Sequence, residues 1–139
     1  GEAAFSLGLV ADILGSSEEA EQAWIRADRD SRQPIIEARY QLAKLAVKKG
    51  DRARAAEHFI SFITAGNQEI TRIQREVTAI MGGPPSTAFK TFTKFPDKAL
   101  KLLRRQNTIA RDMAKAAQFL KSEKIDPPPF FTLPKVVPQ

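Results

Sequence analysis

The fold is decided by residues 38–62, which read ARYQLAKLAVKKGDRARAAEHFISF. Small and apolar side chains recur at helical spacing on both sides of Gly50-Asp51, a pair that is typical of a tight turn. The pattern therefore predicts two antiparallel helices that pack through small residues, with large rings filling the remaining space. The two packing faces consist of Ala38, Leu42, Ala43 and Ala46 in the first helix and of Ala55, Ala56, Phe59 and Phe62 in the second.

The same pattern occurs 35 residues earlier in the chain. Taken in order, Leu42, Ala43, Ala46, Gly50, Ala55, Phe59 and Phe62 correspond to Leu7, Gly8, Ala11, Gly15, Ala20, Trp24 and Ala27. A helix–turn–helix unit that repeats at this period is typical of a helical solenoid. These residues resemble the tetratricopeptide repeat, and the resemblance covers residues 1–66.

The resemblance implies an all-α fold: a short right-handed solenoid of antiparallel helix hairpins. We expect a repeat domain over residues 1–125, with units at 1–34 and 36–69. A degenerate third unit and a long C-terminal capping helix would fill residues 70–125. Proteins of this family are interaction modules without chemistry of their own, and they usually bind an extended peptide in a concave groove.

In that family the first helix of each unit lines the groove, on the face away from its packing stripe. Helical geometry places one such face in each unit here, and Glu2 borders the first of them. The predicted groove residues are Phe5, Leu9, Asp12, Ile13, Glu37, Tyr40, Lys44, Val47 and Lys48. One subfamily grips a terminal carboxylate with paired Lys and Asn. No Asn stands near Lys44 and Lys48, so we do not expect that clamp.

Periodicity and capping residues predict the helices along the chain. We expect helices over residues 2–14, from Ser16 or Ser17 to about Arg29, and then over about 35–49, 52–64 and 68–81. Gly66 would stop the fourth helix and Asn67 would cap the fifth. A short helix is expected over about 87–94, and the longest helix over about 97–123.

The basic character of the chain is confined to its C-terminal part. Residues 1–83 hold 11 Lys and Arg against 12 Asp and Glu, whereas residues 84–139 hold 11 against 4. Such asymmetry attracts acidic protein, nucleic acid or anionic lipid. We interpret the basic surface of residues 98–121 as a solvated helix face, with an anion-binding patch as the alternative. The candidate anion-binding residues are Lys98, Lys101, Arg104, Arg105 and Lys115.

Residues 126–139, called the tail here, read DPPPFFTLPKVVPQ and cannot form a helix, because five of them are proline. We expect an extended segment, partly in polyproline II. It would dock on the apolar groove or on an equivalent surface, within the chain or between two copies. Its candidate anchors are Phe130, Phe131 and Leu133.

The sequence gives no sign of enzyme chemistry. It contains no cysteine and a single histidine, His58, so neither a metal site nor a catalytic site is expected. Gly82-Gly83-Pro84-Pro85 lacks the Gly-Lys-Ser/Thr of a phosphate loop. We therefore expect no cofactor and no small-molecule substrate. No apolar run is long enough to span a membrane, and a soluble, cytoplasmic location is slightly favoured. An upstream targeting signal or further repeats stay open.

The function that these observations favour is protein–protein interaction, as a scaffold or adaptor segment of a larger protein. The partner would be a protein or a peptide. One alternative is an electrostatic module that binds nucleic acid or anionic membrane through the basic C-terminal helix. Another is a non-catalytic regulatory domain fused to an enzyme. Self-association through the tail is a further expectation.

Overall fold

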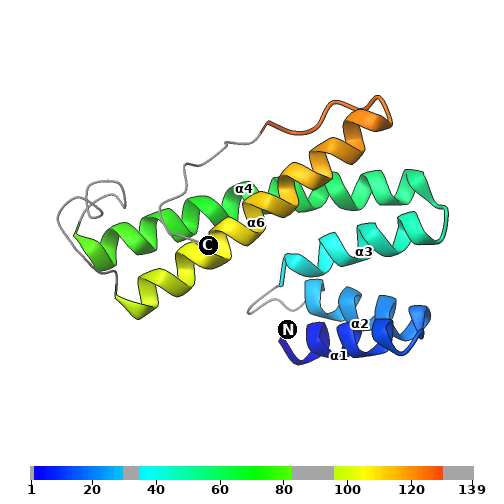
Figure 1. Cartoon of the computed structure of the whole chain (residues 1–139), viewed down its shortest axis with the longest axis horizontal. Helices are drawn as coiled ribbons and strands as arrows, with labels where there is room; N and C mark the ends of the chain where they lie inside the picture. The colour runs from blue at the N-terminus through cyan, green and yellow to red at the C-terminus, as the bar shows by residue number, and fades with distance from the viewer. Residues whose placement is uncertain (1, 30–34, 83–95, 130–139) are drawn as a thin grey trace.

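The structure, a computed structural model, describes residues 2–29, 35–82 and 96–129. These residues form helices and no strand, which confirms the all-α prediction. The helices are α1 (Glu2–Ile13), α2 (Ser17–Arg29), α3 (Glu37–Lys48), α4 (Arg52–Met81) and α6 (Asp97–Ser122). Each helix packs chiefly on the next one in the chain, and α6 crosses α4 and also contacts α3 (Figure 1).

The turns of the two hairpins have the same geometry, 35 residues apart. Gly15 has a φ of 82° and Gly50 a φ of 81°, the left-handed conformation that glycine adopts without strain. In each turn the amide after the glycine donates to a carbonyl five residues back, as in a Schellman motif. These bonds are 2.8 Å from Ser16 N to Ala11 O and 2.9 Å from Asp51 N to Ala46 O. The repeat in the sequence is therefore also a repeat of backbone structure at the turns.

A very close helix contact joins α1 to α2. A Cβ atom at Gly8 would lie only 2.3 Å from Nε1 of Trp24, so the indole ring occupies the space that any side chain at this position would need. Trp24 is 1% exposed and belongs to a small apolar cluster between α1, α2 and α3. The absence of a side chain at Gly8 thus sets the distance between the first two helices.

The larger core lies between α3, α4 and α6 and contains aromatic rings that pack at tilted angles. The centroid of the Tyr40 ring lies 5.2 Å from that of Phe62 and 5.9 Å from that of Phe59, and Phe59 lies 4.8 Å from Phe119 of α6. The small residues predicted for the seam of this hairpin, Ala43 and Ala55, are fully buried. Large rings and small residues thus fill this core in the way the sequence predicts.

The predicted break at Gly66 is wrong, because α4 runs without interruption from Arg52 to Met81. Gly66 lies against α6, where a Cβ atom would approach Sδ of Met113 to 2.6 Å. Instead of capping a helix, the Asn67 side chain donates a hydrogen bond of 2.7 Å to the carbonyl of Pro129. Gly66 therefore serves close packing, and α4, with 30 residues against 26 in α6, is the longest helix.

The other predicted boundaries agree with the structure within two residues. The short helix expected over 87–94 lies outside the described residues, as do the tail anchors Phe130, Phe131 and Leu133. The described start of the tail, residues 126–129, has no helix. Through Pro129 it reaches Asn67 in the middle of α4.

We predict that Gly8→Ala destabilises the protein by ~1–3 kcal/mol, because the new methyl group overpacks the seam against the rigid indole of Trp24. The free energy of unfolding in urea measures this effect. Gly66→Ala is the matched control. Its new methyl group also needs a shift, but of the flexible Met113 side chain and not of a rigid ring, so it should cost less than Gly8→Ala does. Equal midpoints for Gly8→Ala and the wild type would contradict the close contact.

Candidate binding cleft

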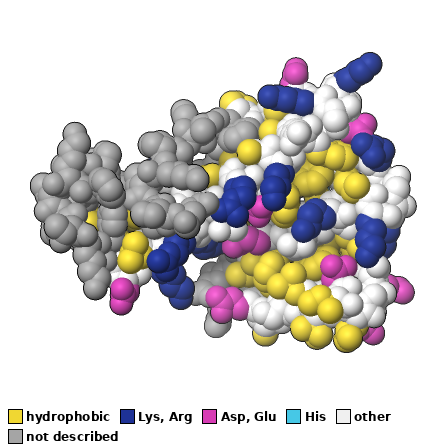
Figure 2. Space-filling view, viewed as in Figure 1, with side chains coloured by type: hydrophobic (Ala, Val, Ile, Leu, Met, Phe, Trp, Pro, Cys, Tyr) yellow, Lys and Arg dark blue, Asp and Glu magenta, His cyan; other side chains and the backbone are white. Residues whose placement is uncertain are grey.

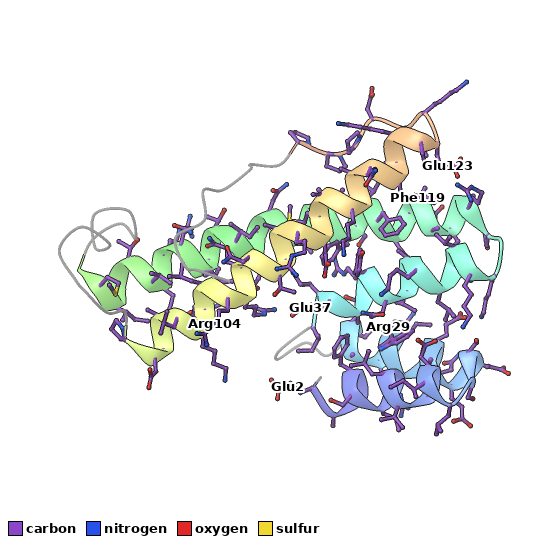
Figure 3. The ribbon with its side chains drawn as sticks, in the orientation of Figure 1. Glu2, Arg29, Glu37, Arg104, Phe119 and Glu123 are labelled. Atoms are coloured by element: carbon purple, nitrogen blue, oxygen red, sulfur yellow. The ribbon has the colours of Figure 1, made fainter. Side chains whose placement is uncertain are left out.

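A cleft of about 1100 Å³ lies between the N-terminal ends of α1 and α3, the middle of α4 and one residue of α6. Glu2 and Glu37, labelled in Figure 3, mark the ends of α1 and α3 that border it. Its apolar lining consists of Phe5, Ile35, Ile36 and Ala65, and its neutral polar lining of Ser6, Thr64 and Gln68. Its charged lining consists of Glu2, Glu37, Arg39, Glu69, Arg72 and Arg105.

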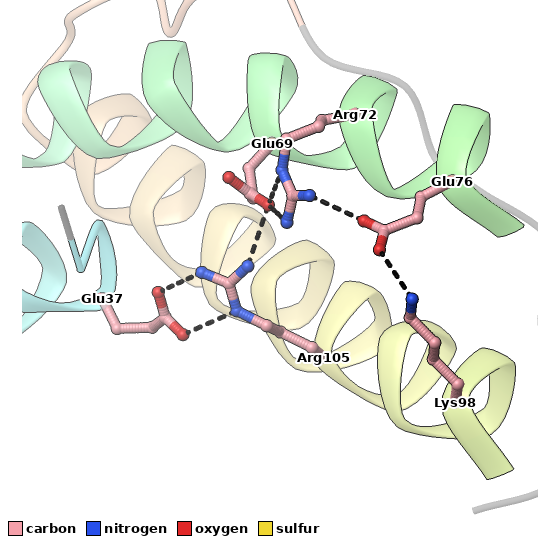
Figure 4. A network of polar contacts seen from close by, with 6 residues as sticks. All are labelled: Glu37, Glu69, Arg72, Glu76, Lys98 and Arg105. Carbon is pink, nitrogen blue, oxygen red and sulfur yellow. Dashed lines mark hydrogen bonds and ion pairs between the residues drawn. The ribbon is translucent and has the colours of Figure 1, made fainter. Parts of the chain in front are cut away.

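One guanidinium group joins three helices at this cleft (Figure 4). Arg105 of α6 donates to both carboxylate oxygens of Glu37, from Nε at 3.2 Å and from Nη2 at 3.0 Å. Its Nη1 donates to Glu69 of α4 at 2.8 Å. Such two-point contacts between Arg and a carboxylate fix direction as well as distance. The position of α6 relative to α3 and α4 is therefore set by directed bonds as well as by the core.

The network continues along α4 through pairs at helical spacing. Glu69 also accepts from Nε of Arg72 at 2.7 Å, and Nη1 of Arg72 donates to Glu76 at 2.7 Å. At its end, Nζ of Lys98 lies 3.8 Å from Glu76 (Figure 4). Two clamped carboxylates, those of Glu37 and Glu69, thus hold Arg105 in one orientation at the wall of the cleft.

Two pKa shifts agree with this picture. Burial by itself raises the pKa of the Glu69 carboxyl, but the hydrogen bond from Arg72 and the charge of Arg105 outweigh it and hold the pKa below its ordinary value. Burial by itself lowers the pKa of Arg105, but its hydrogen bonds to Glu37 and Glu69 and the charges of these carboxylates outweigh burial and raise the pKa above its ordinary value. Both groups are therefore stabilised in their charged forms.

The cleft carries no net charge, because its three Glu are matched by three Arg. Its third arginine, Arg39, is held from outside the cleft. Nε of Arg39 donates to Asp28 at 2.6 Å, and Nη1 donates to the Ser61 hydroxyl at 3.1 Å. The cleft therefore combines an apolar lining with oriented polar groups, and its electrostatics favour neither a strongly acidic nor a strongly basic ligand.

The structure separates the predicted groove residues into two groups. Phe5 and Glu37 line the cleft. Further along α1, Leu9 is 36% exposed and Ile13 is 83% exposed, whereas Asp12 is half-buried. The first helix of unit one thus contributes to the cleft with its N-terminal half only.

The expectation that Tyr40 is exposed in the groove is wrong, because its ring is packed between Phe59 and Phe62 and is only 8% exposed. Lys44 lies over the Tyr40 ring, with Nζ 5.2 Å from the centroid. Lys48 is exposed, and Val47 packs partly against the core. These α3 residues do not line the cleft.

The predicted basic residues differ in their surroundings. The expectation that Arg105 is solvated is wrong, because its bonds to Glu37 and Glu69 neutralise it. Lys98 remains 71% exposed and lies within reach of Glu76. The other three, Lys101, Arg104 and Lys115, are exposed on α6.

Sequence reasoning missed the α4 wall of the cleft. Because a stop was predicted at Gly66, the α4 residues of the cleft were assigned to two helices, although they lie on one continuous helix. These residues are Thr64, Ala65, Gln68, Glu69 and Arg72. A usable signal was present, because Glu69, Arg72 and Glu76 have the three- and four-residue spacing of ion pairs along a helix.

Among residues 2–29, 35–82 and 96–129 no group of three or more side chains is placed to hold a metal ion. Within the same ranges, none of the helices has the length and apolarity required to cross a membrane. Comparison of the chain with protein-family models, with curated proteins and with solved structures finds no match.

We predict that Arg105→Gln lowers the free energy of unfolding by ~1–2 kcal/mol, because it removes charged hydrogen bonds that solvent partly screens. Lys101→Gln is the control on the same helix and should change stability by less than ~0.5 kcal/mol, as is usual for a surface site. Urea denaturation of both variants measures the difference. Equal losses would mean that the bonds to Glu37 and Glu69 contribute nothing.

The same network predicts a dependence on pH. The pKa of Glu69 is lower in the folded than in the unfolded protein, so the unfolded state takes up its proton first as the pH falls. Stability should therefore decrease as the pH falls through and below the ordinary glutamate pKa of 4.5. Unfolding midpoints measured in acid should show a smaller decrease for Glu69→Gln than for the wild type. Parallel curves would contradict the assignment.

Proposed function

We propose that this chain is a protein–protein interaction module that binds an extended segment of a partner protein in the cleft between α1, α3, α4 and α6. We propose further that its hairpins belong to a solenoid similar to the tetratricopeptide repeat. The two identical turns at Gly15 and Gly50 support the repeat. The same binding role would serve a scaffold, an adaptor or a non-catalytic domain attached to an enzyme.

The observation that carries this proposal is the pairing of an apolar lining with a neutral set of fixed polar groups. A peptide offers both kinds of contact, since its backbone donates and accepts hydrogen bonds while its side chains supply apolar area. Apolar anchors of the peptide would pack on Phe5, Ile36 and Ala65. Exposed Gln68 offers a donor and an acceptor to the peptide backbone.

The cleft also fits a peptide better than it fits a polyanion. Arg72 and Arg105 are already bonded to carboxylates, so a phosphate would have to displace Glu37 or Glu69. Breaking such part-buried pairs costs more than a solvated phosphate contact returns. A segment of ordinary charge meets no such competition, and the clamped side chains keep their orientation when it binds.

A second candidate function rests on the outer surface of α6. Lys101, Arg104 and Lys115 lie there at spacings of three and eleven residues, which places them on one face of the helix, and all three are exposed. This surface is suited to a polyanion, and we propose it as the alternative function. The face carries no exposed aromatic ring for stacking on bases among the described residues, because Phe119 is packed on Phe59.

The proposed function is tested with a displayed library of random peptides selected on the wild-type chain. We expect enriched peptides that carry apolar residues and that lose at least about tenfold in affinity for Thr64→Arg, because the new side chain fills the cleft. Thr64 is exposed, so the substitution should leave the fold intact. Fluorescence anisotropy of a labelled peptide gives the affinities.

The control is Lys101→Gln, which should bind the same peptides as the wild type does. If Thr64→Arg binds as tightly as the wild type, the cleft is not the site. The salt dependence of binding distinguishes the α6 alternative from binding in the cleft. Binding through many phosphate contacts falls roughly a thousandfold between low and physiological salt, whereas binding in a neutral cleft changes little.

A further inference from the structure

One side of α1 is apolar and faces solvent. The residues concerned are Leu7, Leu9, Val10, Ile13 and Leu14, called the outer face of α1 here. They are 53%, 36%, 52%, 83% and 77% exposed and are the exposed large hydrophobic residues of the described chain. Figure 2 shows hydrophobic side chains gathered along the lower part of the molecule, where α1 lies. A contiguous patch of this kind marks an interaction site.

The internal repeat shows what such a face does when it has a neighbour. Leu42 of α3 corresponds to Leu7 of α1, yet Leu42 is 5% exposed. The difference arises because α3 packs on the helix that precedes it, α2, whereas α1 packs chiefly on the helix that follows it. The outer face of α1 therefore has the character of a helix-packing surface.

We propose that the outer face of α1 is a self-association interface, on which α1 of a second copy packs in the antiparallel direction. Between Glu2 and Asp12, α1 contains no charged residue, so the surface that complements it is also uncharged. The large exposed hydrophobics of the described residues all lie on α1 or directly after it, so within the described structure this surface is provided by the same face of a second copy. Two identical faces in contact form a twofold-symmetric interface.

The order of small and large residues along α1 sets the direction. Ala3 and Ser6 are small and exposed, whereas Val10, Ile13 and Leu14 are large and exposed. Antiparallel packing places the large C-terminal half of one helix over the small N-terminal half of the other. Parallel packing would oppose large to large and leave a gap between the small residues, and gaps and overpacking are both unfavourable.

The spacing along the outer face also fits a helix partner. Ala3, Leu7, Val10 and Leu14 are separated by four, three and four residues, the pattern by which one helix packs along another. The other end of the row of helices is different, since α6 exposes Lys101, Arg104 and Lys115. Stacking of α1 on α6 of a second copy would bury those charges against apolar side chains, which is unfavourable.

The first test measures the mass of the whole chain in solution. Sedimentation or light scattering over a rising concentration series should show a monomer that becomes a dimer. Ile13→Lys should remain a monomer, because the interface would have to bury an unpaired charge. The matched control is Ala79→Lys, which places the same charge on an exposed site of α4 and should dimerise as the wild type does. Circular dichroism melts confirm that both variants fold.

The second test measures direction, and the absence of cysteine makes it simple. Copies carrying Ala3→Cys are mixed with copies carrying Ile13→Cys, and a short bifunctional thiol reagent is added. In the antiparallel dimer the two positions come together, so the mixed product should form. Two copies of Ala3→Cys should cross-link poorly, because their positions lie about 15 Å apart along the helix axis.

A wild-type chain that stays monomeric at high concentration, or a dimer that persists in Ile13→Lys, would overturn the proposal. Preferred cross-linking of Ala3→Cys to itself would overturn the direction. Dissociation by added salt would also count against it, since an apolar interface is not screened. The two proposals can fail separately, because Thr64→Arg leaves the α1 sequence unchanged and should still dimerise.

Discussion

The clamp on Arg105 is the interaction on which the cleft depends. It binds Glu37 of α3 and Glu69 of α4, residues that lie 68 and 36 positions away in the sequence. Most of the folding free energy comes from the buried core between α3, α4 and α6, because apolar burial is the dominant favourable term. Directed bonds to two carboxylates add a fixed orientation to this packing, and they hold the Arg105 side chain in place at the wall of the cleft.

The ends of the row of helices have opposite character, and the packing scheme explains why this matters. Because each helix packs chiefly on its chain neighbours, α1 and α6 each keep one face that no other described helix covers. Helical repeat proteins remain soluble when such faces are polar. The exposed Lys101, Arg104 and Lys115 give α6 a polar face. On α1 the corresponding face holds Val10 and Ile13, so only that end of the described structure gains by acquiring a partner.

Local patterns in the sequence predicted what depends on local structure. The turns at Gly15 and Gly50, the small-residue seams and most helix ends follow from chirality, capping and period. Two features depended on contacts distant in sequence and could not be read in this way. A glycine at position 66 is typical of a helix end, so local sequence predicts a stop there. In the structure Gly66 lies inside α4, where it allows the close approach of Met113 from α6. Tyr40 was placed by helical phase alone, but Phe59 and Phe62 enclose it. Of the predicted groove residues only Phe5 and Glu37 line the cleft, and the α4 wall was not predicted.

The two proposed surfaces share an edge, and this has a consequence for binding. Ser6 lines the cleft and also lies among the small residues that would receive Ile13 of a second copy. An occupant of the cleft and a second α1 helix therefore approach the same turn of α1. If they contact each other favourably, each tightens the binding of the other, and if they collide, each weakens it by the same factor, because coupling between two sites is reciprocal. Whether cleft binding strengthens or weakens dimerisation depends on how far a bound segment extends past Ser6. Peptides of different length that share one anchor would therefore shift the monomer–dimer equilibrium by different amounts, and long peptides would shift it most.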